Sequence, residues 1–171
     1  GTMLTDYAHV LAADGDYVEK ARRIEAASRD LAEVLLENRE RLRQLSLRRS
    51  SRRIAFHSPC TLQHGLRVRG AVEALLSDLG FVLTPVPDSH LCCGSAGTYS
   101  ILQPELSARL REAKQAALSS GHPDEIVTAN IRCLVHLQSG VPTRVRHWIE
   151  LVDECLAPNA ASAAAPVEPA R

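Results

Sequence analysis

The sequence predicts an α/β fold: a four-stranded, mainly parallel sheet with helices on both faces, preceded by a long amphipathic helix. Two observations predict this fold. Four short apolar runs typical of strands alternate with four helical segments after residue 50. Strands that alternate with helices are joined by right-handed crossovers into a parallel sheet that is covered on both faces. With 171 residues and 45% hydrophobic content, the chain is long enough for one such domain.

The first fifty residues contain the amphipathic helix and a basic linker. From about residue 16 to residue 47, apolar side chains recur on one helical stripe, and Arg and Glu occupy most other positions. The segment "SLRRSSRR" then ends the pattern. We expect the charged face to be solvated, and docking of the stripe on a partner is the alternative. The stripe consists of Tyr17, Ala21, Ile24, Leu31, Leu35, Leu42 and Leu45.

Residues 51–156 are predicted to form the main domain. Its strands are expected at residues 53–56, 81–84, 125–128 and 143–146. The helices that follow them are expected at about residues 66–79, 104–119, 131–138 and 148–156. Pro104 in a first turn and Gly121 beyond a last turn support the second of these helices. The tail, residues 157–171, has too few large apolar side chains to pack and is predicted to be disordered.

Composition and charge exclude several classes of protein. The formal net charge is zero, which argues against a nucleic-acid partner. No apolar run approaches the length of a membrane span, and no signal peptide is recognisable, so we expect a cytoplasmic protein with reduced thiols. The odd number of cysteines, five, agrees with that compartment. The start at Gly1, with the single Met at position 3, predicts that the chain is a fragment.

Four of the five cysteines follow the ends of predicted strands. Cys60 follows the first strand, Cys92 and Cys93 follow the second, and Cys133 follows the third. The loops at the carboxyl ends of parallel strands converge on one crevice, so we expect these thiols to meet there. Adjacent cysteines do not easily form a disulfide with each other. Cys155 lies among apolar residues of the last helix and is expected to be a buried structural thiol.

The residues alone leave three interpretations of these thiols open. They could be buried structural cysteines. They could bind zinc, although zinc ligands usually come in closely spaced pairs and the short spacing here is that of Cys133 and His136. They could hold an iron–sulfur cluster, which takes thiolates from scattered loops and gains from nearby backbone N–H groups, a role that suits Gly94 and Gly97. No Cys-x-x-Cys pair of a disulfide oxidoreductase is present.

Three histidines lie close to the cysteines in the sequence. His57 and His90 could donate hydrogen bonds to cluster sulfurs, although a loop histidine satisfied by the protein itself is the commoner case. His136 follows Cys133 by three residues on a predicted helix, so its imidazole could face the same centre as that thiolate. Packing is the alternative for His136, and the two are held equal.

Four segments carry a resemblance to a known family. They are "HSPCTLQHG", "PDSHLCCGSAGTY", "IVTANIRCLVHL" and "VRHWIELVDECL". They resemble the cysteine-rich domain with the Cys-Cys-Gly signature that occurs in the heterodisulfide reductase B subunit. They are more closely similar to the iron–sulfur subunits of bacterial glycolate oxidases, from about Thr2 to Leu156. The first two segments together are specific, whereas Cys-Cys-Gly alone would be a weak signal.

The resemblance implies an iron–sulfur protein with a ferredoxin-like domain and two cysteine-rich halves, of which this chain would hold the second. It implies a 4Fe-4S cluster with Cys60, Cys92, Cys93 and Cys133 as metal ligands and no catalytic residue in this chain. His136 and Gly94 are further cofactor-binding candidates. His136 stands where the wider family has the second cysteine of a Cys-x-x-Cys motif.

The resemblance also implies a function and partners. Such a subunit passes electrons from a FAD-containing glycolate oxidase subunit, which oxidises glycolate to glyoxylate, toward a quinone-like acceptor. The complex would be cytoplasmic and peripheral on the inner face of the cell membrane, and the isolated chain would be inactive. Related subunits that act with lactate, glycerol 3-phosphate or heterodisulfide oxidoreductases are the alternative within this class. A zinc-binding assembly module without redox function is the alternative outside it.

Overall fold

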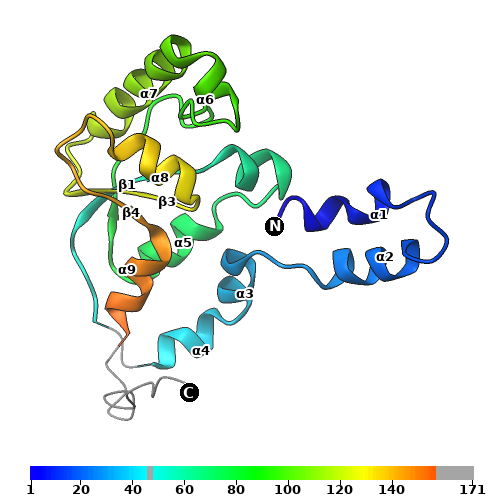
Figure 1. Cartoon of the computed structure of the whole chain (residues 1–171). Coiled ribbons are helices and arrows are strands. Elements are labelled where there is room, and N and C mark those ends of the chain that lie inside the picture. The colour runs from blue at the N-terminus through cyan, green and yellow to red at the C-terminus, as the bar shows by residue number, and fades with distance from the viewer. Residues whose placement is uncertain (46–47, 157–171) are drawn as a thin grey trace, which may run out of the picture.

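The computed structural model describes residues 1–45 and 48–156, and it confirms the predicted α/β fold (Figure 1). Its four strands are β1 (Arg53–His57), β2 (Val82–Leu83), β3 (Glu125–Thr128) and β4 (Val145–His147). They form one sheet in the order β2-β1-β3-β4, and every neighbouring pair is parallel. The predicted disordered tail and two residues of the basic linker lie outside the described residues.

The sheet agrees with the predicted strands except at some ends. β2 is shorter than predicted because Pro85 has no N–H with which to continue the ladder, although Thr84 still donates to the carbonyl of Ile54 at 2.9 Å. β4 begins two residues later than predicted. There the amide of Val145 donates to the side chain of Gln138 at 2.8 Å. These differences leave the carboxyl ends of the strands on one edge.

Helices cover both faces of the sheet, as predicted. Figure 1 shows α5 (Ala71–Asp78) and α9 (Trp148–Cys155) on one side and α7 (Pro104–Ser119) and α8 (Ile131–Gln138) on the other. Alternate residues of a strand face opposite sides, so Ile54 and Phe56 pack toward α5 and α9 while Ala55 packs toward α7 and α8. Complete burial of a large aliphatic side chain stabilises the fold by about 1.5–3 kcal/mol. The two cores therefore hold the sheet between its helices.

The predicted N-terminal helix is present but divided. Short η1 (Leu4–Asp6) and α1 (Tyr7–Val10) precede α2 (Val18–Ala27), α3 (Leu31–Glu37) and α4 (Arg39–Gln44). Asp30 has an extended backbone and starts α3 with a capping box, in which its side chain accepts from the amide of Ala32 and Glu33 bonds back to the amide of Asp30. The helical periodicity therefore continues across this break although the helix itself does not.

The apolar stripe of this segment is only partly covered. Leu35 and Leu42 pack against the core formed by α5 and α9, and Ala21 is buried. Tyr17, Ile24, Leu31 and Leu45 stay exposed. For Tyr17 and Ile24, Figure 1 shows the reason, because α1 and α2 form a hairpin that projects away from the sheet. The division of the chain into residues 1–50, 51–156 and 157–171 stays a prediction.

Candidate metal centre

The four cysteines at the strand ends meet in one pocket. β1 and β3 are neighbours in the sheet, and the chain leaves them toward opposite faces, which opens a crevice between their carboxyl ends. Cys60 follows β1, Cys92 and Cys93 lie in the loop after β2, and Cys133 lies in the first turn of α8. All four line a pocket of about 180 Å³, and all are free thiols. The structure thus brings the predicted residues together.

Local interactions fix the position of each thiol. Asn130 caps α8, and its side chain accepts from the amides of Arg132 at 2.9 Å and Cys133 at 3.4 Å. Cys60 precedes η2 (Thr61–Gly65), a single π-helical turn, and the carbonyl of Pro59 accepts from two amides at its start. Cys93 and Cys133 are buried, whereas Cys60 and Cys92 are half-buried at the pocket mouth. The pocket therefore has a dry inner end and an accessible outer end.

The hydroxyl of Ser95 lies between the two buried sulfurs. Its oxygen is 3.2 Å from the Cys93 sulfur and donates to the Cys133 sulfur at 3.7 Å. Ser95 is itself buried. This residue was not singled out by the sequence, although its place two residues after Cys93 in "CCGSAG" is a usable signal. It can orient both sulfurs and tune their charge.

Gly94 is required where it stands. Its φ is +90°, which side chains rarely tolerate, and an added Cβ would lie 2.5 Å from the carbonyl oxygen of Ser107. Its amide donates to the Cys92 sulfur at 3.3 Å, and its carbonyl accepts from the Ser107 hydroxyl at 2.8 Å. The backbone N–H contact with sulfur that was expected of Gly94 is therefore present.

The thiols are too crowded to ionise together. Burial and the neighbouring Cys92 raise the pKa of Cys60. A hydrogen bond with Cys93 and burial raise the pKa of Cys92 well above its usual range. The pKa of Cys133 is lowered, chiefly by a hydrogen bond from Cys93 and further by Ser95. A bound cation reverses this preference because it favours every thiolate at once, so the site is suited to a metal.

A buried lysine lies beside the thiols. The ammonium of Lys114, on α7, donates to the carbonyl oxygens of Asp88 at 2.8 Å and Ser89 at 3.3 Å, in the loop that leads to Cys92. Burial lowers the pKa of Lys114, and the nearby thiols of Cys93, Cys60 and Cys92 oppose that shift. The lysine can therefore offset negative charge in the pocket.

His57 faces the buried sulfurs. A ring nitrogen of His57 and the sulfurs of Cys93 and Cys133 all lie within 4.8 Å of one another. The side chain is 2% exposed, and neither ring nitrogen has a hydrogen-bond partner among the described residues. Thr128, its neighbour across β1 and β3, also has an unpartnered buried hydroxyl. The inner end of the pocket thus combines two thiols with an unpartnered imidazole.

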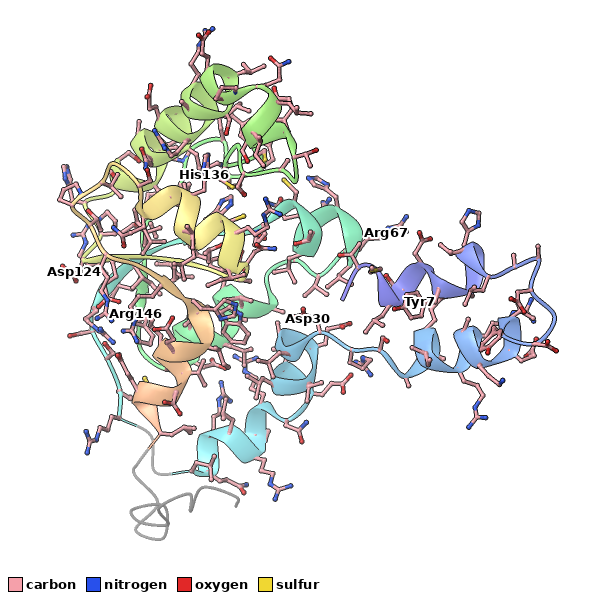
Figure 2. The ribbon with its side chains drawn as sticks, in the orientation of Figure 1. Tyr7, Asp30, Arg67, Asp124, His136 and Arg146 are labelled. Carbon is pink, nitrogen blue, oxygen red and sulfur yellow. The ribbon has the colours of Figure 1, made fainter. Side chains whose placement is uncertain are left out.

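Two other predicted histidines lie elsewhere. The imidazole of His136 lies between α8 and α7 (Figure 2), where its Nε2 is 3.3 Å from the Ser107 hydroxyl. Burial lowers its pKa. His90 is exposed beside the loop before Cys92. Gly97 lines the cysteine pocket, and Cys155 packs in the core under α9, as expected. A ligand role for His136 stays a prediction.

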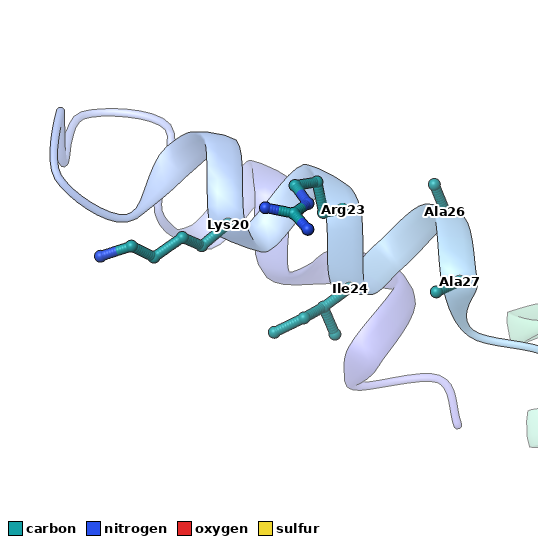
Figure 3. A pocket seen from close by; sticks show the side chains of 5 residues that line it. All are labelled: Lys20, Arg23, Ile24, Ala26 and Ala27. Carbon is teal, nitrogen blue, oxygen red and sulfur yellow. The ribbon is translucent and has the colours of Figure 1, made fainter.

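A larger hollow lies away from this pocket. It lies on α2 (Figure 3), measures about 660 Å³ and is lined by Lys20, Arg23, Ile24, Ala26 and Ala27. It contains no thiol, imidazole or carboxylate. The hollow lies on an uncovered helix face of the projecting hairpin. The candidate metal ligands lie at the carboxyl edge of the sheet instead.

Comparison with known families decides the class of the domain. Residues 54–138, which span β1 to α8 and all four clustered cysteines, match the family described as "Cysteine-rich domain". These residues form a cysteine-rich domain of this family. The resemblance predicted from "CCGSAG" and its companion segments is thereby confirmed.

Curated relatives extend the similarity beyond the cysteine-rich domain. The glycolate oxidase iron–sulfur subunit of Escherichia coli is 50% identical over 156 residues, which cover 91% of this chain and 38% of that protein. A probable glycolate oxidase iron–sulfur subunit of Bacillus subtilis is 29% identical over 82% of this chain and 32% of its own length. Lactate utilization protein A of Anoxybacillus flavithermus is 25% identical over 89% of this chain and 66% of its own length.

The chain thus spans about a third to two thirds of these relatives. Its cysteine-rich domain is homologous to part of iron–sulfur subunits of oxidoreductases. Among residues 1–45 and 48–156, no helix combines the length and hydropathy needed to cross a membrane.

Proposed function

We propose that this chain is the second cysteine-rich half of a glycolate oxidase iron–sulfur subunit, which carries electrons away from glycolate oxidation. One observation carries the proposal. Four thiols from three loops line one pocket, in a chain that is half identical to a glycolate oxidase iron–sulfur subunit over nearly its whole length. Soft thiolate donors favour iron–sulfur clusters, and scattered loops are a usual source of their ligands.

In this proposal Cys60, Cys92, Cys93 and Cys133 bind a 4Fe-4S cluster. The donor set fits, because the pocket offers four thiols and additional hydrogen-bond donors to sulfur. When bound, the cluster supplies one-electron transfer. The chain's own residues set its environment: the Gly94 amide and the Ser95 hydroxyl bond the cysteine sulfurs, and Lys114 contributes positive charge.

The wider reaction belongs to the assembled oxidase. Glycolate loses two electrons and two protons when it becomes glyoxylate, and a FAD-containing subunit would take up both electrons. This chain would accept them one at a time and pass them toward a quinone-like acceptor at the inner face of the cell membrane. A thiol pocket without a substrate-binding base is consistent with this relay role, so the isolated chain should not oxidise glycolate.

Exposed apolar side chains next to the pocket mark the surface that the flavin subunit would cover. Ile131 and Val135 on α8 line a hollow of about 310 Å³ that shares Ser95 and Arg132 with the cysteine pocket. Ile101 is also strongly exposed nearby, on α6 (Tyr99–Leu102). Large exposed apolar patches mark interaction surfaces. Electron transfer also requires the donor to approach the cluster closely, which this position permits.

The decisive experiment is anaerobic reconstitution of the chain with iron and sulfide. We expect iron and acid-labile sulfide in equal amounts and an electron paramagnetic resonance signal in one oxidation state. Cys93→Ser and Cys60→Ser should lose the iron while circular dichroism stays unchanged, because serine has nearly the volume of cysteine and both residues lie outside the strands of the sheet. Cys155→Ser, in the core, is the control and should retain the cluster. Zinc bound without sulfide, after expression with ample iron, would refute the proposal.

Lactate oxidation is the second candidate function. It is favoured by the similarity to lactate utilization protein A, which covers the same part of the chain. Partner subunits that co-purify with the chain should be assayed with glycolate and with lactate. A complex that oxidises lactate and not glycolate would replace the first candidate and leave the electron-transfer role of this chain intact.

A further inference from the structure

We propose that His57 is a metal ligand of this centre, at the inner end of the pocket beside Cys93 and Cys133. The inference rests on the proposed metal centre and adds a donor to it. In the sequence, His136 is a candidate imidazole donor with packing as an equal alternative, whereas in the folded structure His57 is the histidine within 4.8 Å of the Cys93 and Cys133 sulfurs.

The position of His57 follows from the pleat of β1. Successive residues of a strand alternate between faces, so His57 shares a face with Ala55, on the side of α7 and α8. Cys93 and Cys133 belong to the core on that same side. As the last residue of β1, His57 also reaches the carboxyl edge where the loops converge. The ring therefore faces the inner end of the pocket.

The unpartnered ring nitrogens point to a missing ligand. His57 is 2% exposed, yet neither Nδ1 nor Nε2 has a hydrogen-bond partner among the described residues. A buried polar group without a partner costs about 1–3 kcal/mol, and native proteins rarely leave one in that state. A metal bound by one ring nitrogen would remove this cost for that atom. The Thr128 hydroxyl, also buried and unpartnered, lies beside it in the sheet.

The spacing of the three donors allows a single Co²⁺ ion to bind all of them after a small contraction, and in an iron–sulfur cluster the imidazole would be a further protein donor beside Cys93 and Cys133. The ring nitrogen and the two sulfurs lie within 4.8 Å of one another. Tetrahedral bonds to sulfur and nitrogen place donors about 3.5–3.8 Å apart. The donors therefore have to approach by about 1.3 Å at most, which side-chain rotation can supply. Ser95, which contacts both sulfurs, would then hold the two cysteine ligands in position through its hydroxyl group.

Binding of Co²⁺ to the metal-free, reduced chain tests this inference without any enzyme activity. Cobalt–thiolate absorption reports the sulfur ligands, and titration gives the affinity. We expect His57→Leu and His57→Ala to weaken Co²⁺ binding at least tenfold. His9→Ala is the matched control because it removes an exposed imidazole on α1, away from the pocket, and it should change the affinity less than twofold.

The stability of the metal-free protein gives an independent readout. An apolar side chain at position 57 removes a buried, unsatisfied imidazole, so His57→Leu should raise the melting temperature of the metal-free chain while it lowers metal affinity. If His57 only packs in the core, its replacement by leucine should not lower the affinity for the metal. A His57→Leu variant that is destabilised and binds Co²⁺ normally would overturn the inference.

The iron-loaded chain, made with ¹⁵N-histidine, separates this inference from the proposed function. Pulsed electron paramagnetic resonance should show a directly bound nitrogen that is lost in His57→Leu and retained in His9→Ala. A normal iron and sulfide content without nitrogen coupling would uphold the function and refute the role of His57. If the wild-type chain takes up no iron and sulfide, the proposed function fails, and the Co²⁺ titration still decides the ligand.

Discussion

The two edges of the sheet carry opposite kinds of chemistry. At the amino edge, Arg52 forms ion pairs with Glu125 and Glu154, both at 2.6 Å. Arg146, 5% exposed, lies 2.6 Å from Glu154 and 3.5 Å from Glu125. At the carboxyl edge, four thiols line a pocket, and a buried imidazole and a buried hydroxyl lack partners among the described residues.

The charged groups at the amino edge stabilise the fold, whereas the donors at the carboxyl edge are arranged to bind a ligand. Charges at the amino edge neutralise one another as ion pairs that join the start of β1 to β3, β4 and α9, although Glu125 Oε2 and Arg146 Nη1 have no hydrogen-bond partner among the described residues. The donors at the carboxyl edge repel one another when ionised and are incompletely satisfied. Substitutions at the two edges should therefore have different consequences: loss of stability at one and loss of metal at the other.

Arg146→Met should give the largest loss of stability. The change leaves Glu125, which is largely buried, with Arg52 as its remaining cation, and it removes partners of Glu150 and Glu154. We expect a loss of about 3 kcal/mol in the free energy of unfolding, the lower part of the range for a broken buried pair. Urea denaturation measures it, with the exposed Arg144→Met as the control. Iron content per folded molecule should stay the same. A variant that folds normally but loses iron would contradict the assignment of stability to the amino edge and metal binding to the carboxyl edge.

Gly94→Ala should disturb the carboxyl edge next most strongly. The positive φ and the close approach to the Ser107 carbonyl predict a loss of about 2–3 kcal/mol, because the loop has to shift. That shift moves Cys92 and Cys93, so metal affinity should fall as well. Gly97→Ala is the matched control: its φ is +48°, but an added Cβ has open space. Equal losses in the two variants would show that crowding around position 94 has no importance.

Lys114→Met should change the redox properties more than the stability. Methionine keeps most of the buried volume but removes the positive charge beside the thiols. Reduction adds negative charge to the site, so loss of the ammonium should lower the reduction potential of the reconstituted cluster. A redox titration measures the midpoint, and Lys20→Met on the projecting hairpin is the control. A raised midpoint in Lys114→Met would contradict this role.

The sequence predicted the sheet and its helices because each strand–helix repeat has its own periodicity and its own end signals. It predicted one helix where there are three, because the stripe from Tyr17 to Leu45 keeps its period across Asp30. The signal for the break was present, since Asp30 and Glu33 form the spacing of a capping box. Local capping therefore prevailed over a longer apolar pattern.

The meeting of the four cysteines was predictable because strand ends converge in a parallel sheet. Which histidine lies next to these cysteines was harder to predict from the sequence. Residues three apart on a helix are rotated by about 60° from one another, and this turns His136 from the pocket of Cys133 toward Ser107. His57 could be placed only with the strand register, which decides that it shares the face of Ala55. Tertiary register, rather than spacing, selects the candidate ligand.

Asp78→Asn should have the smallest effect and should depend on pH. The carboxylate of Asp78, at the end of α5, pairs with Arg39 and Arg43 of α4, and the hydrogen bond from Arg39 is the main reason that its pKa is lowered. A carboxyl whose pKa is lower in the folded state stabilises the protein fully above its unfolded pKa of about 3.9, and this stabilisation is lost as the pH falls through the folded value. At pH 7 the variant should therefore melt roughly 2–4 °C below the wild type, and the gap should close as the pH is lowered below about 4. Thermal melts in low and high salt measure the gap. A gap that grows toward acid pH would mean that Asp78 acts through something other than its charge.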